Sequence, residues 1–439
     1  MKFEKLFYVA ISSIVIVAFI LIRYISSPSG SGDNLNSNIK KIYFVDHISA
    51  AHQKVIDRFN EKYRGQIEVV AINLPFTKFS TNERKELLAR YLRSRSDRID
   101  IFSVDQIWVP RFAKWAIPME KYINPLTKDN LLKFAMQSCY FRDTLVAIPL
   151  YIDIALMSYR KDLLGKLPDH EIVEKKIKES ITWEDFISLQ NRLGYSQNPF
   201  FLFQADDYEG LVCIFAEMMA NQNKPMIIDG ALQLNSEEAK RALQLLVDLV
   251  NKYNVSPQEV VTLKENSSYD YFIANDGVFL RGWTSFLSND SKRSYNYNKV
   301  FDKLGEAPTP HFAGFSPVSV FGGWNLMISK FSTKIPEAVK FVNYLISDEA
   351  QKIMYEEALF LPISEKIYKD LSYAKDFPRL QFYYKLLKRG FHRPFMENYT
   401  NVSDFLSYYL NQAIRKELSV EDALKMASEK INSGSILIK

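Results

Sequence analysis

The sequence predicts an α/β fold with a parallel sheet, divided into two domains behind an N-terminal targeting segment. Three observations lead to this prediction. Apolar strand-like runs alternate with amphipathic helical patterns from Ile39 onward, which is typical of a parallel sheet covered by helices. The chain has 439 residues, more than one compact domain usually holds. It also opens with an apolar run followed by a polar, Gly/Ser-rich stretch.

The composition is that of an ordinary globular protein, with 47% hydrophobic and 24% charged residues. The net charge of +5 is spread thinly, and the densest basic run, residues 84–98, also contains Glu86 and Asp97. This mixture is typical of a solvated helix face, so we expect no nucleic-acid partner. The two cysteines, Cys139 and Cys213, could pair in an oxidising compartment, and the sequence leaves that open.

The N-terminus carries the clearest signal of cellular location. Residues 6–22 contain no charged side chain, and Lys2 and Lys5 precede them. We therefore interpret residues 1–25 as a transmembrane signal anchor that keeps the N-terminus in the cytoplasm and exports the rest. Residues 26–38 are predicted to form a flexible tether. Cleavage after the apolar run, which would release a secreted protein, is the alternative.

The first part of the exported chain is predicted to alternate three strands with helices. The strands are expected over residues 41–45, 67–72 and 99–104. Apolar residues at helical spacing follow each strand, namely Val55, Phe59 and Tyr63, then Leu87, Leu88, Tyr91 and Leu92, then residues 109–115. This repetition predicts parallel pairing of the three strands.

Two segments are predicted to cross between the domains. The first is residues 150–154, flanked by apolar runs at 145–149 and 155–159, and the second is the Gly- and Pro-containing stretch 312–320. Further strands are expected over 276–283 and 324–329. Helix starts are predicted at Thr182 or Trp183, at Asn235 with Glu238, at Pro336, and at Ser419 with Asp422.

Motifs of known catalytic and cofactor sites are missing from the sequence. It contains no HExxH, GxSxG, P-loop or GxGxxG pattern, and its five histidines lack zinc-ligand spacing. We therefore expect no catalytic residue, no metal and no cofactor. A glycosidase, which needs only two facing carboxylates, stays open because a linear sequence does not place carboxylates in space.

Five segments together resemble the extracellular solute-binding proteins of ATP-binding-cassette transporters, in particular the maltose/trehalose-type sugar-binding group, family 1. They are residues 100–122, 147–164, 277–283, 321–351 and 393–406. The resemblance implies a two-lobed periplasmic-binding-protein fold of type II, with the ligand in the cleft between the lobes. It implies an N-terminal lobe of residues 39–149 plus 316–352 and a C-terminal lobe of residues 150–315 plus 353–439.

A neutral sugar is bound by fixed polar groups for its hydroxyls and by aromatic rings for its apolar faces. Asp105 follows the third predicted strand, where ligands of open α/β sheets bind, and capping of the next helix is the alternative role. Asp153 lies among apolar residues and needs a partner, which is either a structural arginine or a ligand hydroxyl with a hinge amide. Tyr151 beside it offers a ring or a hydroxyl.

The remaining candidate ligand-binding residues come largely from the resemblance. Trp283 and Trp324 match stacking tryptophans, and Gly323 beside Trp324 lets the backbone approach a ligand closely. Arg393 matches an arginine that reaches the ligand, with a salt bridge on a helix flank as the alternative. Arg84 and Asp46 lie where the family has polar contacts, although the sequence around Asp46 departs from the usual pattern. The bound sugar is therefore expected to differ from maltose or trehalose.

These features together predict a monomeric, non-catalytic protein that captures a mono- or oligosaccharide outside the cytoplasm and delivers it to an ABC transporter permease. A membrane-anchored sensor or adaptor with the same fold is one alternative. An extracytoplasmic carbohydrate-active enzyme is another. A third alternative keeps the binding role and replaces the sugar by a peptide, a polyamine or an anion.

Overall fold

A computed structural model describes residues 39–75, 78, 81–95, 98–194, 198–228, 231–295 and 298–433. Contacts between residues divide the chain into two units, Met1–Ile39 and Lys40–Lys439, and every element below belongs to the second. The predicted anchor at 1–25 and the predicted tether at 26–38 lie outside the described residues. Within the described part, no helix combines the length and apolar character that crossing a membrane requires.

The strands are β1 (Lys40–Asp46), β2 (Ile67–Asn73), β3 (Ile101–Asp105), β4 (Tyr140–Phe141), β5 (Thr144–Leu145), β6 (Ile148–Arg160), β7 (Phe201–Leu202), β8 (Ile227–Ile228), β9 (Ala231–Leu232), β10 (Phe279–Trp283), β11 (Leu304–Ala307), β12 (Ser319–Ile328) and β13 (Gly390–Phe391). The short 3-10 helices are η1 (Gln106–Trp108), η2 (Ala113–Trp115), η3 (Glu120–Tyr122), η4 (Gln258–Thr262), η5 (Thr284–Leu287) and η6 (Lys299–Lys303).

The α-helices are α2 (Ala50–Lys62), α3 (Thr81–Arg93), α4 (Val109–Phe112), α5 (Pro125–Asp129), α6 (Lys133–Gln137), α7 (Lys161–Leu164), α8 (His170–Glu179), α9 (Trp183–Leu193), α10 (Glu209–Ala220), α11 (Glu237–Asn251), α12 (Glu265–Ala274), α13 (Asn289–Ser294), α14 (Ile335–Leu345), α15 (Asp348–Ala358), α16 (Glu365–Lys369), α17 (Leu371–Asp376), α18 (Arg379–Leu387), α19 (Tyr399–Ile414) and α20 (Val420–Asn432).

One mixed sheet organises these elements, with the strand order β2-β1-β3-β12-β6-β10-β7, while β11 pairs with β6 and β13 with β12. Strand β1 pairs in parallel with both β2 and β3, as predicted from the alternation of strands and helices. Strand β12 runs antiparallel to both of its long neighbours, β3 and β6. The sheet is therefore an α/β sheet with a parallel part and an antiparallel centre.

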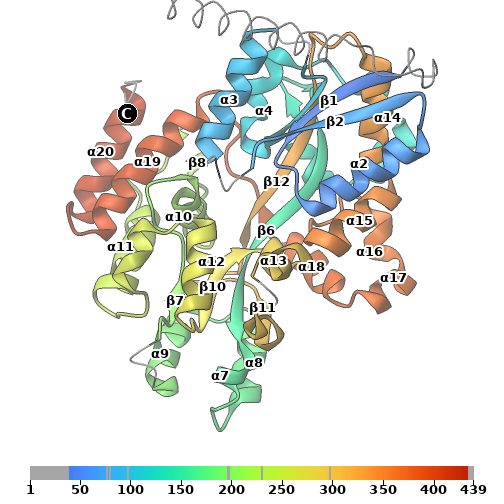
Figure 1. Ribbon diagram of the computed structural model, residues 1–439. Helices are drawn as coiled ribbons and strands as arrows, with labels where there is room; N and C mark the ends of the chain where they lie inside the picture. Colours follow the sequence, from blue (N-terminus) through green and yellow to red (C-terminus); the bar gives the residue numbers. More distant parts are fainter. Residues whose placement is uncertain are drawn as a thin grey trace, which may run out of the picture. The chain divides into compact units, whose positions relative to one another are not determined.

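Strand β6 is continuous through the segment predicted to be a separate crossing. Its first part pairs with β12, and its last part pairs with β10 and β11 (Figure 1). The predicted crossing at residues 150–154 is therefore part of one long strand, and its role as a crossing between two lobes stays a prediction. Nearly every side chain of β6 is buried, and a strand covered on both faces shows a continuous apolar run without the alternation that marks its extent.

Capping hydrogen bonds in the structure confirm two of the predicted helix starts and correct a third. Thr182 caps α9 by accepting a hydrogen bond from the amide of Asp185 at 3.2 Å, and Ser419 caps α20 through the amide of Asp422 at 3.0 Å. The predicted start at Asn235 was wrong. The hydroxyl of Ser236 accepts from the amide of Ala239 at 3.2 Å, so α11 begins one residue later.

The remaining boundaries differ by a few residues or in helix type. The predicted strand 276–283 is shorter, because β10 starts at Phe279, and the predicted strand 324–329 belongs to β12, which already starts at Ser319. The predicted helix 109–115 is divided into α4 and η2. Pro336 lies in the first turn of α14, where a missing amide proton leaves no helical hydrogen bond unmade.

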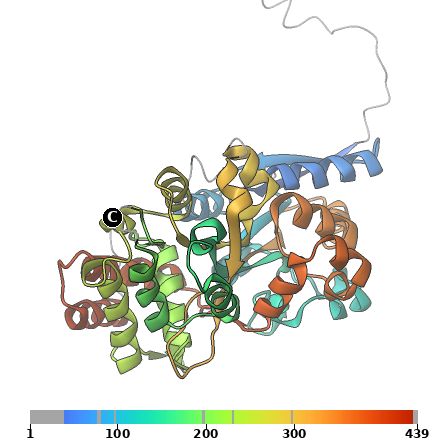
Figure 2. The same ribbon diagram turned by 90° about the horizontal axis from the view of Figure 1, so that it is seen from below.

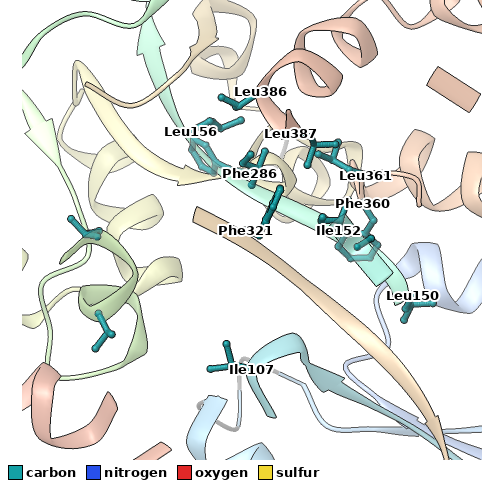
Figure 3. Packing of buried hydrophobic residues seen from close by; sticks show 14 of the residues in the cluster. Ile107, Leu150, Ile152, Leu156, Phe286, Phe321, Phe360, Leu361, Leu386 and Leu387 are labelled. Atoms are coloured by element: carbon teal, nitrogen blue, oxygen red, sulfur yellow. The ribbon is translucent and has the colours of Figure 1, made fainter. Parts of the chain in front are cut away.

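Buried apolar side chains surround the two central strands. Figure 3 shows Ile152 and Leu156 of β6 beside Phe321 of β12, with Leu361 and Leu387 of the C-terminal part packed nearby. Helices α10, α11, α19 and α20 pack against one another, as Figures 1 and 2 both show. The two cysteines, at positions 139 and 213, are buried free thiols.

Candidate ligand-binding site

Three of the predicted site residues lie side by side across the centre of the sheet. Trp324 of β12 pairs in register with Asp105 at the end of β3 on one side and with Tyr151 of β6 on the other. Residues directly opposite each other on neighbouring strands project from the same face of a sheet. A carboxylate, an indole and a phenol are thus brought together, and each of the three side chains is only partly buried.

Trp324 is held by aromatic and cationic neighbours. The guanidinium of Arg84 on α3 lies 4.5 Å from the centroid of its ring, and Trp108 meets it edge-on at 5.6 Å. Arg84 is itself fixed by a hydrogen bond of 3.1 Å from its Nη2 to Oδ1 of Asp46. Both members of this ion pair are buried. The predicted residues Arg84 and Asp46 therefore contribute to the candidate site indirectly, because they hold Trp324 in place.

Two histidines that were not predicted, His47 directly after β1 and His52 on α2, lie beside Asp46. Nε2 of His52 lies 3.6 Å from Oδ2 of Asp46, and the amide of His47 donates to Oδ1 of Asp46 at 2.6 Å. Burial lowers the pKa of both imidazoles, that of His47 to about 4, against the opposing effect of Asp46. Next to them, the ring of Tyr151 stacks on Phe360 at 4.0 Å, so one face of Tyr151 is covered.

Asp153 is satisfied by protein donors close to the sheet centre. Its Oδ1 accepts hydrogen bonds from the hydroxyl of Thr284 at 2.8 Å, from the amide of Thr284 at 3.3 Å and from the amide of Ile154 at 2.8 Å. Burial raises the pKa of Asp153 to about 6, while these hydrogen bonds favour the ionised form. The amide of the second predicted alternative is thus present, together with a threonine hydroxyl that was not expected, and contact of Asp153 with a ligand hydroxyl stays a prediction.

Arg393 joins two carboxylates that come from distant parts of the chain. Its Nη2 lies 3.4 Å from Oδ1 of Asp105, and its Nη1 donates to Oε1 of Glu209 at the start of α10. Glu209 also accepts hydrogen bonds from the hydroxyls of Tyr399, at 2.8 Å, and Ser403. Arg393 is buried. The predicted alternative, a salt bridge on a helix flank, is thus present in the form of a buried arginine paired with two carboxylates.

Asp105 takes the capping role that was its predicted alternative, and its contact with a ligand stays a prediction. Its Oδ1 accepts from the amide of Ile107 at 3.1 Å, so it caps η1. Burial raises its pKa, the charge of Arg393 opposes that effect, and the nearby carboxylates Glu209 and Glu265 add to it. The side chain of Asp105 nevertheless keeps 15% of its surface exposed, so it retains room for another hydrogen-bond donor.

The second predicted tryptophan, Trp283, packs against β12 at Gly322, two positions before Trp324. A Cβ atom on Gly322 would lie 2.8 Å from the ring of Trp283, so the indole covers β12 at a position only glycine permits. The guanidinium of Arg281 lies 5.0 Å from the Trp283 ring and 3.8 Å from Glu217. Gly323 has φ of +126°, and a Cβ there would lie 2.6 Å from the carbonyl oxygen of Tyr151. The lack of a side chain at Gly323 therefore permits the close packing of β12 on β6.

Acidic side chains outnumber arginines among the site residues described above. Six carboxylates (Asp46, Asp105, Asp153, Glu209, Glu217 and Glu265) accompany three arginines (Arg84, Arg281 and Arg393). Burial raises the pKa of Glu217 and of Glu265, while Arg281 opposes it. Carboxylates of this kind accept hydrogen bonds from hydroxyl or amine donors, and the adjacent rings offer apolar faces. No set of three or more His, Cys, Asp and Glu side chains able to hold a metal occurs in the described part of the chain.

Residues 44–352 match the family model of the bacterial extracellular solute-binding proteins. The chain belongs to this family. Among curated relatives, a probable ABC transporter-binding protein of Deinococcus radiodurans is 25% identical over 350 residues, which cover 79% of this chain and 82% of the relative. The predicted membership in the solute-binding proteins is thereby confirmed.

Solved structures resemble this solute-binding protein over nearly its whole described length. MalE3 of T. maritima with maltose bound has a TM-score of 0.80 and 27% identity, covering 90% of this chain and 100% of the other. An ABC transporter solute-binding protein of Thermotoga lettingae with α-D-tagatose bound has a TM-score of 0.77 and 22% identity, covering 90% and 99%. The second likeness concerns the fold alone.

The nine predicted site residues of the solute-binding protein differ in exposure. Asp105, Tyr151, Trp283 and Trp324 are partly exposed, whereas Asp46, Arg84, Asp153, Gly323 and Arg393 are buried with protein neighbours. Contact of any of them with a ligand stays a prediction. Sequence reasoning missed Glu209, which is 184 positions away from its partner Arg393, because no local pattern links residues so far apart.

Proposed function

We propose that this protein is the substrate-binding component of an ABC-type importer and that it captures a carbohydrate beside Trp324. The observation that carries the proposal is the row formed by Asp105, Trp324 and Tyr151, in which a partly exposed carboxylate and two rings project from one face of the sheet. A sugar needs such acceptors for its hydroxyls and such rings for its apolar faces.

The relatives support the carbohydrate and the transporter. The T. maritima structure is a maltose complex, and the Deinococcus radiodurans relative bears the name of an ABC transporter-binding protein. On this basis we assign the ligand to the mono- and oligosaccharides and the partner to the permease subunits of an ABC transporter. Catalysis plays no part in this proposal, which requires only reversible binding.

We assign direct contact with the sugar to the four partly exposed residues, Asp105, Tyr151, Trp283 and Trp324. The buried predicted residues then hold these four in place. Arg84 and Asp46 fix the indole of Trp324, Arg393 fixes Asp105, and Asp153 fixes the start of η5 directly after Trp283. Fixed side chains lose little conformational freedom on binding, which favours affinity.

The ligand cleft is proposed to lie between two lobes, residues 39–149 plus 316–352 and residues 150–315 plus 353–439. Binding then shifts a population of open and closed forms towards the closed form, which the permease recognises. Arg393 suits such a movement because it joins Asp105 of the first proposed lobe to Glu209 of the second. Residues 1–25 are proposed to anchor the monomeric protein on the outer side of the cytoplasmic membrane, with secretion after cleavage as the alternative.

The test is a thermal-shift screen of residues 39–439 with mono- to tetrasaccharides, and with amino acids and peptides as controls. A ligand bound only by the folded state raises stability by about 2.7 kcal/mol at one hundred times its dissociation constant. We expect a saturable rise in melting temperature with a saccharide. A rise in melting temperature with peptides or amines alone would refute the proposal that the ligand is a carbohydrate. No rise with any compound would favour the role of a sensor or adaptor.

A further inference from the structure

A cavity of about 760 Å³ lies on the other side of β12 from the candidate site. Phe321 and Gly322 are neighbours on β12, so their Cα substituents face opposite sides of the sheet. Trp283 of the candidate site covers Gly322, whereas Phe321 lines the cavity. The cavity is wide open to solvent, and its volume is comparable with that of small-molecule sites. The two places are therefore back to back across one strand.

The walls of the cavity are aromatic. Phe321 stacks on Phe134 at 5.3 Å with an angle of 12° between the rings, and His392 lies 4.7 Å from Phe321 and 5.0 Å from Phe395. Phe395 is 37% exposed, and Figure 3 shows Phe321 beside the buried side chains of the C-terminal part. Such walls fit the flat faces of a ring compound.

The polar groups of the cavity favour an anion. Its lining includes Lys388, His392 and Gln137 and contains no carboxylate. Lys388 is exposed and lies over the ring of Tyr384 at 4.3 Å. A cation at the rim of an apolar hollow attracts a ligand that carries a negative group on a hydrocarbon body.

The imidazole of His392 is placed between two acceptors. Its Nε2 lies 2.7 Å from the carbonyl oxygen of Phe134, and its Nδ1 lies 3.0 Å from Oε1 of Gln106. The amide nitrogen of Gln106 donates to the carbonyl oxygen of Phe321 at 2.6 Å, which fixes the orientation of the glutamine. A neutral imidazole donates only once, so one of its two contacts brings two lone pairs together, whereas an imidazolium donates to both.

An anion in the cavity would resolve this conflict. Burial lowers the pKa of His392 to about 4, the hydrogen bond to Phe134 opposes that effect, and the charge of Arg393 adds to it. The charges around the ring are Arg393 in the same segment, Lys388 at the cavity, and Asp105, which precedes Gln106 and pairs with Arg393. A negative ligand group near Lys388 and His392 would favour the protonated ring, and the ring would then satisfy both acceptors.

We propose that the cavity lined by Phe134, Phe321, Phe395, Lys388 and His392 is a second binding site, and that it takes a small organic anion with an apolar ring and a proton together. The proposal is independent of the sugar site, since no residue assigned to sugar contact lines the cavity.

The probe is naphthalene-2-sulfonate, whose sulfonate stays ionised from pH 5 to pH 8, titrated calorimetrically into the full-length chain. We expect saturable binding that tightens at least about fivefold from pH 8 to pH 5, because uptake of one proton links affinity to pH. His392→Gln should remove this pH dependence. Phe395→Ala should weaken binding about fivefold through loss of one ring contact.

Lys388→Ala should also weaken binding, whereas its matched control Lys252→Ala should not. Lys252 is likewise an exposed lysine over a tyrosine ring, at 5.1 Å from Tyr253, and lies outside the cavity. Circular dichroism at each pH checks that the variants are folded. The proposal is overturned if no saturable heat is seen at any pH, or if Lys388→Ala and Phe395→Ala bind as the unmodified chain does. These two exposed positions decide the matter even if His392→Gln fails to fold.

Discussion

The guanidinium of Arg84 lies over the indole of Trp324 at 4.5 Å, while its Nη2 is hydrogen-bonded to Asp46 at 3.1 Å. The arginine is thus held between a carboxylate and a ring, and the ring is held in turn. A guanidinium combines a planar face for stacking with a fixed set of donors, which an ammonium group does not offer. The orientation of Trp324 therefore depends on the identity of residue 84 as well as on its charge.

Arg84→Lys is expected to weaken sugar binding about fivefold, because the stacking contact over Trp324 is lost while the charge opposite Asp46 is kept. Calorimetric titration with the responding saccharide measures the affinity, and the emission maximum of tryptophan fluorescence reports on the ring. Arg241→Lys is the control, since Arg241 lies over Phe312 at 4.5 Å outside the proposed contacts. Equal losses in both variants would contradict a specific role of Arg84.

Arg393→Met is expected to destabilise the protein by about 3–5 kcal/mol, since it leaves Asp105 and Glu209 without their counter-charge. Urea denaturation measures the free energy of unfolding. Adding Glu209→Gln should recover part of the loss by removing one stranded charge. Arg142→Ala serves as the control because its ion pair with Glu397 is exposed, and such pairs contribute little. A small effect of Arg393→Met would show that the buried pair is dispensable.

Asp153 should make stability fall as the pH rises. Its pKa is raised to about 6 in the folded protein by burial, while an unfolded aspartate titrates near 4. Between these values the folded state binds more protons at Asp153 than the unfolded state, so the contribution of Asp153 to stability is fully present below about pH 4 and is lost up to about pH 6. Asp153→Asn should flatten this decline in urea denaturation series from pH 4 to pH 7.

Glu306 needs a separate control in that series, because burial also raises its pKa to about 6. Its carboxylate accepts a hydrogen bond from the hydroxyl of Tyr383 at 2.7 Å, and the charge of Asp153 adds to the rise in its pKa, so Glu306→Gln should remove a similar slope. If Asp153→Asn leaves the pH profile unchanged while Glu306→Gln flattens it, Asp153 is not the titrating group.

Gly323→Ala is expected to destabilise the protein by more than about 2 kcal/mol, because the backbone has positive φ and the new methyl group meets the backbone of β6. A Cβ atom would lie 2.6 Å from the oxygen of Tyr151. Gly314→Ala separates the two causes, since Gly314 has φ of +84° with open space around it. Equal shifts in the urea midpoint would mean that the close approach of β12 to β6 is unimportant.

Much of the sheet could be predicted from local patterns. Strands β1, β2 and β3 carry their signal in short apolar runs, and their parallel pairing follows from the helices between them. β6 could not be delimited in this way because it is buried on both faces over its length. The start of α11 was missed by one residue because Asn235 and Ser236 are both good caps, and only the fold shows which of them accepts the hydrogen bond.

For the candidate site, the sequence pointed to residue types, whereas the contacts between these residues were not predicted. The resemblance to a known family pointed to Trp324, Trp283 and Arg393, and the structure places all three around the centre of the sheet. The roles of Glu209 and Arg281 depend on contacts between segments far apart in the chain, so a linear pattern contains no signal for them. The hydrogen bond between Asp153 and Thr284 likewise joins residues 131 positions apart.

The most direct test of carbohydrate capture is a calorimetric titration of residues 39–439 with maltose and with the best saccharide of the thermal-shift screen, for the unmodified protein and for Trp324→Ala. We predict one-site saturable binding to at least one saccharide, and its loss in Trp324→Ala at an unchanged circular dichroism spectrum. Absence of binding to every saccharide, or undiminished binding by Trp324→Ala, would contradict the proposal that the sugar is held beside Trp324.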